Sequence, residues 1–378
     1  MKLTLKNTPE QVELIRAMGS RNNVVAAEAA EAFAAFLGPV VLQVINQAGT
    51  AGAIYTDAPY DEDDSPSYPL DLYYNEGVNT VQVWSQSMAG GLPTSHTSGL
   101  SELKIATYRL DSAVSMGKRY ARQARLDVVS KAVERMAQEV LVKQERNAWA
   151  IILKALAEGT TSASSGSLQH VVKTEGSAAV TGFNLNALND IMTRMKRINE
   201  SFAGGTPANP YSRGITDLYC SPERMADIRS FAYNALGGST AGASATDLPA
   251  GVRQEIFDSA GMQEIYGVNI VELLELGVGQ KYNTLFDTLA GSTSYLDING
   301  ANGTAFTAND EIMVGIDNSK GAFVRPVARG AEGGSSFQAM PDNQFATDRA
   351  DKLGFYGFLE EGRVCIDARA IVGIFLDL

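Results

Sequence analysis

The sequence predicts an α+β protein with more than one lobe, and three observations favour this class. Its 378 residues exceed the usual size of a single compact core. The stretch from Lys118 to Glu158 contains no glycine or proline, in a chain with 36 glycines and 12 prolines. Runs rich in valine, tyrosine and phenylalanine, separated by turn residues, occur between Tyr55 and Ser101 and again in the last third. A long helix should therefore lie between β-rich regions.

The chain is expected to begin with two helices. Thr8-Pro9 suits the start of the first helix and Gly19 suits its end. The alanine-rich run from Val24 to Leu37 predicts the second helix, which Gly38-Pro39 should stop. Such a helix needs a partner surface for its one apolar face, which holds Val25, Ala29, Phe33, Phe36 and Leu37.

A β excursion is expected between Tyr55 and Ser101. The runs "LDLYY" and "VQVWS" predict two strands around the turn "NEGVNT". The flanking segments, "DAPYDEDDSPSYP" and "MAGGLPTSHTSG", are polar and predict loops. A two-stranded arm of this kind has little core of its own, so it needs another surface to lie against.

The stretch from Lys118 to Glu158 predicts one helix of about 60 Å, at 1.5 Å per residue. Its apolar stripe runs from Val129 to Leu156 and is interrupted by a polar turn at Gln144 and Glu145. A coiled-coil heptad register through Val129 would place Lys143 in the seam. The helix is therefore expected to pack on a sheet of its own subunit.

The rest of the chain predicts mixed structure. "GTTSASSGS" predicts a flexible break, and a second amphipathic helix is expected from about Asn184 to Phe202. "TDLYCS" predicts a short strand and "PERMADIRSFAYNA" a helix. The last third should form antiparallel sheet from "DEIMVGID", "GAFVRPVAR", "KLGFYGFLE" and "RVCIDARAIVGIFL".

Charge is distributed unevenly along the chain. The formal net charge of −12 disfavours general nucleic-acid binding, although a local basic face remains compatible with it. The basic start of the long helix, from Lys118 to Arg125, indicates either an acidic neighbour or a solvated end. The four consecutive acids cannot all face one ion, so a solvated or partner-facing patch is favoured for Asp61, Glu62, Asp63 and Asp64.

Motifs for catalysis or cofactor binding are absent from the sequence. Cys220 and Cys365 are expected to be buried thiols, and His96 and His170 lack metal-ligand spacing. Phosphate-binding glycine loops, nucleophile elbows and an apolar run long enough to span a membrane are also missing. We therefore expect no cofactor, no metal, no membrane association and no enzymatic activity. A soluble α+β enzyme with an unrecognised carboxylate site stays open as an alternative.

The order of these features resembles the major capsid proteins of tailed bacteriophages, which have the Hong Kong 97-like fold. The resemblance covers about Thr8 to Leu378 and depends on several phrases in the right order. These phrases are "PLDLYYNEGVNTVQVWSQSMAGGLPT" for the extended loop, the Lys118–Glu158 stretch for the spine helix, "LYCSPERMADIR" for the start of the axial domain and "KLGFYGFLEEGRVCIDARAIVGIFL" for the closing strands.

The resemblance implies a specific division of the chain. An N-terminal arm would be followed by the extended β loop, a peripheral domain built on the spine helix, and an axial domain. The closing strands would be shared by the peripheral and axial domains. The expected ranges are 1–54 for the arm, 55–105 for the loop, 106–205 for the peripheral domain with helix 118–158, 206–320 for the axial domain and 321–378 for the closing strands.

The resemblance also implies a function in assembly. The chain would form pentamers and hexamers of an icosahedral virion head, enclose double-stranded DNA without sequence-specific binding, and assemble in the host cytoplasm. A portal protein and a separate scaffold protein would be partners, and a need for a decoration protein stays open. A cellular nanocompartment shell similar to encapsulin, which shares the fold and encloses enzymes, is the main alternative.

Contacts between subunits are expected on three parts of the chain. The helical arm would bury apolar side chains across a subunit boundary, the acidic run would face a partner, and the β loop would lie over a neighbouring subunit. These residues are Phe33, Phe36 and Leu37 in the arm, Asp61, Glu62, Asp63 and Asp64 in the acidic run, and Leu72, Tyr73, Tyr74, Val83 and Trp84 in the loop.

Overall fold

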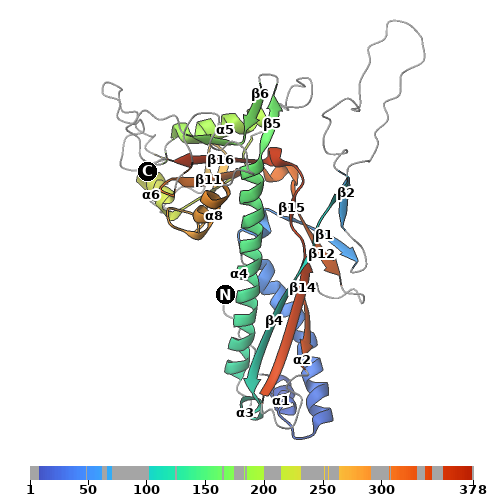
Figure 1. The fold of residues 1–378 in the computed structure, drawn as a ribbon. Coiled ribbons are helices and arrows are strands. Elements are labelled where there is room, and N and C mark those ends of the chain that lie inside the picture. Colours follow the sequence, from blue (N-terminus) through green and yellow to red (C-terminus); the bar gives the residue numbers. More distant parts are fainter. Residues whose placement is uncertain are drawn as a thin grey trace, which may run out of the picture. The chain divides into compact units, whose positions relative to one another are not determined.

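The chain forms two compact units in a computed structural model (Figure 1). Unit 1 comprises Met1–Tyr68, Leu103–Ala148 and Phe323–Val364, and unit 2 comprises Pro69–Glu102, Trp149–Ala322 and Cys365–Leu378. The structure describes residues 8–47, 49–61, 66–69, 102–123, 126–163, 166–173, 185–199, 214–230, 264–290, 308–329, 337–342 and 352–376, with the single positions 183, 251, 254 and 306.

Unit 1 begins with the two predicted helices. Helix α1 (Pro9–Met18) starts at Thr8, whose Oγ1 accepts a hydrogen bond from the Gln11 backbone N–H, and Gly19 ends it as predicted. Helix α2 (Asn23–Gln47) starts where expected but continues past Gly38-Pro39, so the predicted stop is wrong. A proline in a helix interior costs about 3 kcal/mol, which opposes a helix without forbidding one.

The long helical stretch is divided into α3 (Lys118–Arg122) and α4 (Leu126–Glu158), so the prediction of one uninterrupted helix is wrong. Gln123 leaves the helical conformation with ψ near 0°. Next to it, Arg122 Nε donates to the Gly19 carbonyl at 2.9 Å, at the end of α1. The break therefore lies beside a contact with a distant segment, which local helix propensity does not predict. Helix α4 alone is about 50 Å long.

The sheet of unit 1 is built around two long strands that lie side by side in Figure 1. Strand β4 (Tyr108–Gly117) pairs antiparallel with β14 (Lys352–Glu361) over their whole length. Beyond β14 lie β13 (Gln338–Pro341) and β12 (Phe323–Arg329), and β1 (Thr56–Asp61) pairs parallel to β12. The segment "TDAPYD", predicted as loop, is therefore a strand, because β12 supplies the backbone partners that its own sequence does not specify.

The core of unit 1 lies between this sheet and the helices. Apolar residues of α4 pack with Phe355 and Leu359 of β14 and Met116 of β4. Phe33 of α2 lies in the same core, with its ring centroid 5.2 Å from that of Phe355. The prediction that the helix packs on a sheet of its own subunit is confirmed for the α4 residues Val129, Val133, Met136, Ala137 and Val140.

Unit 2 contains a mixed sheet. The strand order is β7 (Val171–Lys173), β16 (Ile371–Leu376), β11 (Glu311–Ile316), β8 (Asp217–Cys220), β10 (Val268–Glu272) and β9 (Glu264–Ile265). The antiparallel prediction holds for β11 with β16 and with β8. It is incomplete for β16, which also runs parallel to β7. Outside the strands of that prediction, β10 runs parallel to β8.

Helices cover both faces of this sheet. On one face, α5 (Leu185–Asn199) packs with Leu218 of β8 and Ile374 of β16. On the other face, the α4 residue Trp149 contacts Tyr219 of β8 and Tyr282 of α8 (Lys281–Ala290), with ring centroids 5.0 Å and 5.7 Å apart. Helix α6 (Pro222–Ser230) follows β8 as predicted.

Short elements complete the described chain. The predicted break "GTTSASSGS" instead forms the hairpin of β5 (Thr160–Ala163) and β6 (Gly166–Gln169), a correction that brings antiparallel pairing to a serine-rich segment. Strand β2 (Ser67–Pro69) pairs with β3 (Glu102–Lys104), so the two ends of the predicted β excursion lie together. The remaining elements are η1 (Ala51–Ala53), η3 (Asn318–Lys320), η5 (Ala368–Ala370) and β15 (Val364–Cys365).

Candidate functional site

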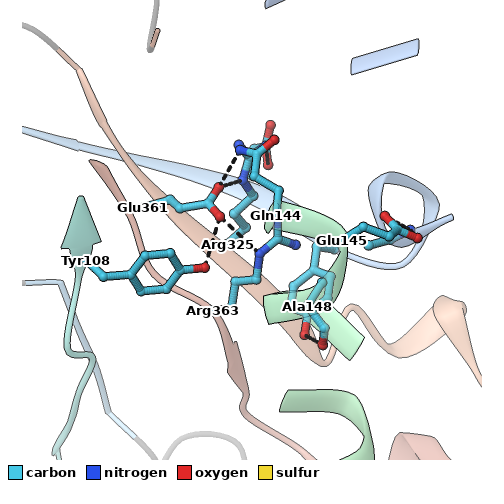
Figure 2. Close-up of polar contacts among 10 residues, drawn as sticks. Tyr108, Gln144, Glu145, Ala148, Arg325, Glu361 and Arg363 are labelled. Carbon is cyan, nitrogen blue, oxygen red and sulfur yellow. Dashed lines mark hydrogen bonds and ion pairs between the residues drawn. The ribbon is translucent and has the colours of Figure 1, made fainter. Parts of the chain in front are cut away.

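The polar turn that interrupts the apolar stripe of α4 lies at the centre of a buried network in unit 1 (Figure 2). Gln144 is 3% exposed, and its Nε2 donates to Oε2 of Glu361 at 2.9 Å. Glu361 is the last residue of β14 and is fully buried. The helix therefore presents an amide to the end of a strand that lies more than two hundred residues later in the sequence.

Glu361 accepts hydrogen bonds from four side chains on four segments. Oε2 also accepts from Nε of Arg325 at 2.7 Å, while Oε1 accepts from the Tyr108 hydroxyl at 2.9 Å and from Nε of Arg363 at 3.3 Å. Arg325 comes from β12 and Tyr108 from β4. We call Glu361 and these four donors, Tyr108, Gln144, Arg325 and Arg363, the Glu361 cluster. It joins α4 to three neighbouring parts of the unit 1 sheet.

Burial and charge shape the titration of this cluster. Burial, with the negative charge of Glu361, raises the pKa of Tyr108 to about 12, so the phenol stays protonated and donates. Burial alone would lower the pKa of Arg363, but the charge of Glu361 together with the contributions of Tyr108 and Tyr55 outweighs burial and raises the pKa. Both donors therefore hold their protons at neutral pH, as a buried carboxylate requires.

The other half of the polar turn holds the linker between α2 and β1. Glu145 accepts hydrogen bonds from the backbone N–H of Thr50 at 2.9 Å and of Ala51 at 3.2 Å, and from the Thr50 hydroxyl. One turn later, the Tyr55 hydroxyl donates to the Ala148 carbonyl at 3.0 Å. Adjacent residues Gln144 and Glu145 thus fix two different segments to the same turn of α4.

Chemically, the Glu361 cluster is suited to holding segments in place. Both oxygens of the carboxylate are occupied by charged or neutral donors, and its side chain has no solvent-exposed surface. A general acid or base must reach a substrate proton within hydrogen-bond distance. Glu361 is enclosed by its own chain, so its position suits a role in holding the helix and strands of unit 1 together.

Unit 2 has a smaller buried ion pair. Nε of Arg224 donates to Oε2 of Glu311 at 3.0 Å, and Nη1 of Arg224 lies 2.6 Å from Asp227. Burial raises the pKa of Glu311, and the lowering effects of Ser221 and Arg224 do not cancel that rise. Burial also lowers the pKa of His170 to about 4, so that its imidazole is neutral at pH 7.

A groove of about 580 Å³ lies on unit 1 between α2 and the β13–β14 pair. Ala30 and Ala34 of α2 form one wall, Met340 and Leu353 of the strands form the other, and Lys118 also lines it. Alanine side chains are short, so the helix leaves room beside the sheet that larger residues would fill. Met340 is 46% exposed there.

The structure places some of the predicted contact residues. Phe33 is 3% exposed and packs within its own chain, and Asp61 is exposed at the end of β1. Phe36 and Leu37 belong to α2, but the positions of their side chains lie outside the described residues. Other predicted contacts also lie outside the described residues and stay predictions: Glu62, Asp63, Asp64, Leu72, Tyr73, Tyr74, Val83 and Trp84.

The Glu361 cluster was not among the residues predicted from sequence to be functional. Gln144 was visible as a break in the apolar stripe, which was the one available signal. Arg325 in "GAFVRPVAR" and Glu361 in "FLEEGR" carry charge inside strands that are otherwise apolar. Such a pattern indicates a buried pair, but it does not name the partner.

The described part of the chain was compared with the requirements of a metal site and of a membrane-spanning helix. Within that part, groups of three or more histidine, cysteine or acidic side chains arranged to hold a metal ion are not found. Among the same residues, helices long and apolar enough to cross a membrane are likewise missing. Cys220 and Cys365 are free thiols, and burial raises the pKa of each to about 12.

Comparison with known proteins identifies the fold. No protein-family model matches the sequence, and no curated protein matches it. The capsid of the cyanophage P-SCSP1u is 14% identical, with a TM-score of 0.51 over 86% of this chain and 88% of that chain. A structure from Microbacterium phage Oxtober96 is 10% identical, with a TM-score of 0.48 over 86% of this chain and 90% of that chain. An encapsulin complex from Synechococcus elongatus is 9% identical, with a TM-score of 0.38 over 73% of this chain and 75% of that chain.

The fold assignment depends on the cyanophage match, which is the one of these three with a TM-score above 0.5. The chain has an α+β fold of the capsid-protein class. More particularly, it has the Hong Kong 97-like fold of tailed-phage major capsid proteins, as the sequence predicted. At 14% identity this similarity establishes the fold alone.

Proposed function

We propose that the chain is the structural shell protein of an icosahedral phage head. The observation that carries this proposal is the similarity to the cyanophage P-SCSP1u capsid over 86% of the chain. Capsid proteins of this fold act by assembly, in which many modest contacts are multiplied by closure of a symmetric shell. The chain would therefore act through its surfaces.

The finer parts of the proposal follow from that role. The subunits would form pentamers and hexamers, enclose double-stranded DNA without reading its sequence, and reside in the virion after assembly in the host cytoplasm. A portal protein would occupy one position of the shell, and a separate scaffold protein would guide assembly. The expected contact residues of the arm, acidic run and β loop belong to this proposal.

A structural role rather than catalysis is also part of the proposal. The Glu361 cluster has its carboxylate fully buried and hydrogen-bonded within unit 1. Such a cluster keeps the unit 1 helices and strands in register when neighbouring subunits exert force on them. It supports a rigid building block.

Electron microscopy of the chain expressed alone, and of the chain expressed together with the genes that adjoin its own, tests the proposal. We expect closed particles of megadalton mass, with DNA inside when the packaging proteins are present. A stable monomer or dimer under both conditions would reject a shell function. Particles that enclose a protein cargo and exclude DNA would instead identify a nanocompartment.

A further inference from the structure

Basic residues are concentrated in one short part of this acidic chain. The 118–148 segment, which includes α3 and the unit 1 part of α4, contains eight basic and four acidic residues. The whole chain contains 31 basic and 43 acidic residues, so the remainder holds 23 basic and 39 acidic. The segment is thus net positive by four charges, whereas the rest is net negative by sixteen. Segregation on this scale indicates a polyanionic partner.

Six of these eight basic side chains are exposed on the helices. The α4 residues Lys131, Arg135, Lys143 and Arg146 are all exposed, as are Arg119 and Arg122 of α3. The opposite side of α4 forms the core of unit 1. At 100° per residue, Lys131, Arg135 and Arg146 project within about 60° of one another. We call the four exposed α4 residues, Lys131, Arg135, Lys143 and Arg146, the basic face.

Acidic residues only partly offset this face. Glu139 is exposed on α4 and Glu134 is half-buried. Glu145 accepts hydrogen bonds from the backbone of Thr50 and Ala51, so its charge is directed toward the linker. A shallow groove of about 460 Å³ runs along the helix here, lined by Lys131, Arg135, Glu134 and neighbouring residues. Among the side chains of α4 that the structure describes, the accessible charge is therefore mainly positive.

We infer that the basic face binds the phosphate backbone of duplex DNA without sequence specificity. From Lys131 to Arg146 the helix rises about 22 Å, and duplex DNA carries about one negative charge per 1.7 Å of its axis. Phosphates are thus dense enough to meet every cation of the face. Lysine and arginine on a regular helix surface bind phosphates and release counterions, which makes the affinity dependent on salt.

This inference rests on the proposed shell function, and it predicts which side of unit 1 lines the inside of the shell. The side of unit 1 that carries the basic face would point toward the packaged DNA. Because the rest of the chain is acidic, the attraction would stay local and weak, and DNA could still leave the shell.

Fluorescence anisotropy of the unassembled full-length chain with two short DNA duplexes of unrelated sequence tests the inference. The test variant is Lys131→Gln/Arg135→Gln/Lys143→Gln. The control variant, Lys104→Gln/Lys196→Gln/Lys281→Gln, removes the same charge from exposed residues elsewhere. We expect the test variant to lose at least tenfold in affinity at about 0.1 M salt, with the salt slope reduced by about 2 to 3. The control should bind both duplexes like wild type.

The outcomes separate this inference from the proposed function. Wild-type affinity in the test variant, with particles still formed, would overturn the inference and leave the shell function intact. Wild-type affinity combined with failed particle assembly would also overturn it and would make the face a contact between copies of the chain. Weakened DNA binding with normal particles supports it. Failure of the wild-type chain to assemble would reject the shell function, whatever the DNA result.

Discussion

Glu361 in unit 1 and Glu311 in unit 2 are both fully buried carboxylates that pair with arginine. Glu361 accepts from two arginines, a tyrosine and a glutamine. Among the described residues, Glu311 pairs with one arginine, Arg224, and accepts a hydrogen bond from the Ser221 side chain, and that arginine also binds Asp227. The first carboxylate balances two buried cations, whereas the second shares one cation with another acid.

This difference in partners predicts which kind of change destabilises each unit. A buried charge is tolerated when partners compensate the loss of water, and it is costly when they do not. In unit 1 the compensation comes from several segments, so the Glu361 cluster also fixes their register. In unit 2 burial dominates, because it raises the pKa of Glu311 and lowers the pKa of His170. Unit 2 should therefore respond to pH more strongly than unit 1.

The largest effect is expected from Glu361→Gln. This change keeps the shape of the side chain but removes the charge that Glu361 sets against buried Arg363, and it leaves Arg325 with only the exposed carboxylate of Asp57, at 3.3 Å. We expect a loss of about 3–5 kcal/mol in the free energy of unfolding of unit 1. Hydrogen exchange of the β14 amides in the unassembled chain measures this loss, because these amides pair with β4 and β13.

Asp111→Asn is the matched control. Asp111 pairs with Arg109 at 2.7 Å, but both side chains are about half exposed, so the change should cost less than about 1 kcal/mol. Equal hydrogen exchange in the two variants would mean that the Glu361 cluster contributes no more than a surface ion pair. The proposed difference between Glu361 in unit 1 and Glu311 in unit 2 would then be wrong for Glu361.

Helices and strands were more predictable from the sequence than the partners with which they pack and pair. The stripe of α4 was predictable because it follows a local 3.6-residue period, and its break at Gln144 was visible. The partner of Gln144, Glu361, could not be predicted, since side-chain pairing at this separation depends on the whole fold. The same limit explains the strand "TDAPYD", which depends on β12, and the interruption at Gln123, beside the contact of Arg122 with Gly19.

The second prediction concerns His170, which is fully buried in unit 2. Its pKa is about 4 in the folded chain and about 6.5 when unfolded, so the unfolded chain takes up the proton first as pH falls. Stability from the neutral imidazole is complete above pH 6.5 and is lost between pH 6.5 and 4. The total loss should be about 3 kcal/mol.

Urea unfolding of a Trp84→Phe chain measures this loss, because Trp149, which stacks on Tyr282 in unit 2, is then the sole tryptophan. Adding His170→Asn should flatten the dependence of stability on pH between 6.5 and 4. An unchanged slope would show that His170 does not cause the acid sensitivity of unit 2. Glu311 would contribute with the opposite sign in this window, so the comparison of the two chains is what isolates the histidine.

The smallest effect is expected from Glu311→Gln, in the same Trp84→Phe background. A buried acid with a raised pKa loses stability as pH rises from its unfolded value through its folded value. The uncharged glutamine has no such loss. The difference in free energy of unfolding between the parent chain and Glu311→Gln should therefore be greatest in acid and should shrink toward neutral pH. At pH 7 we expect a cost of about 1–2 kcal/mol, since Arg224 keeps Asp227 at 2.6 Å. A cost equal to that of Glu361→Gln would show that one arginine compensates a buried carboxylate as well as four donors do.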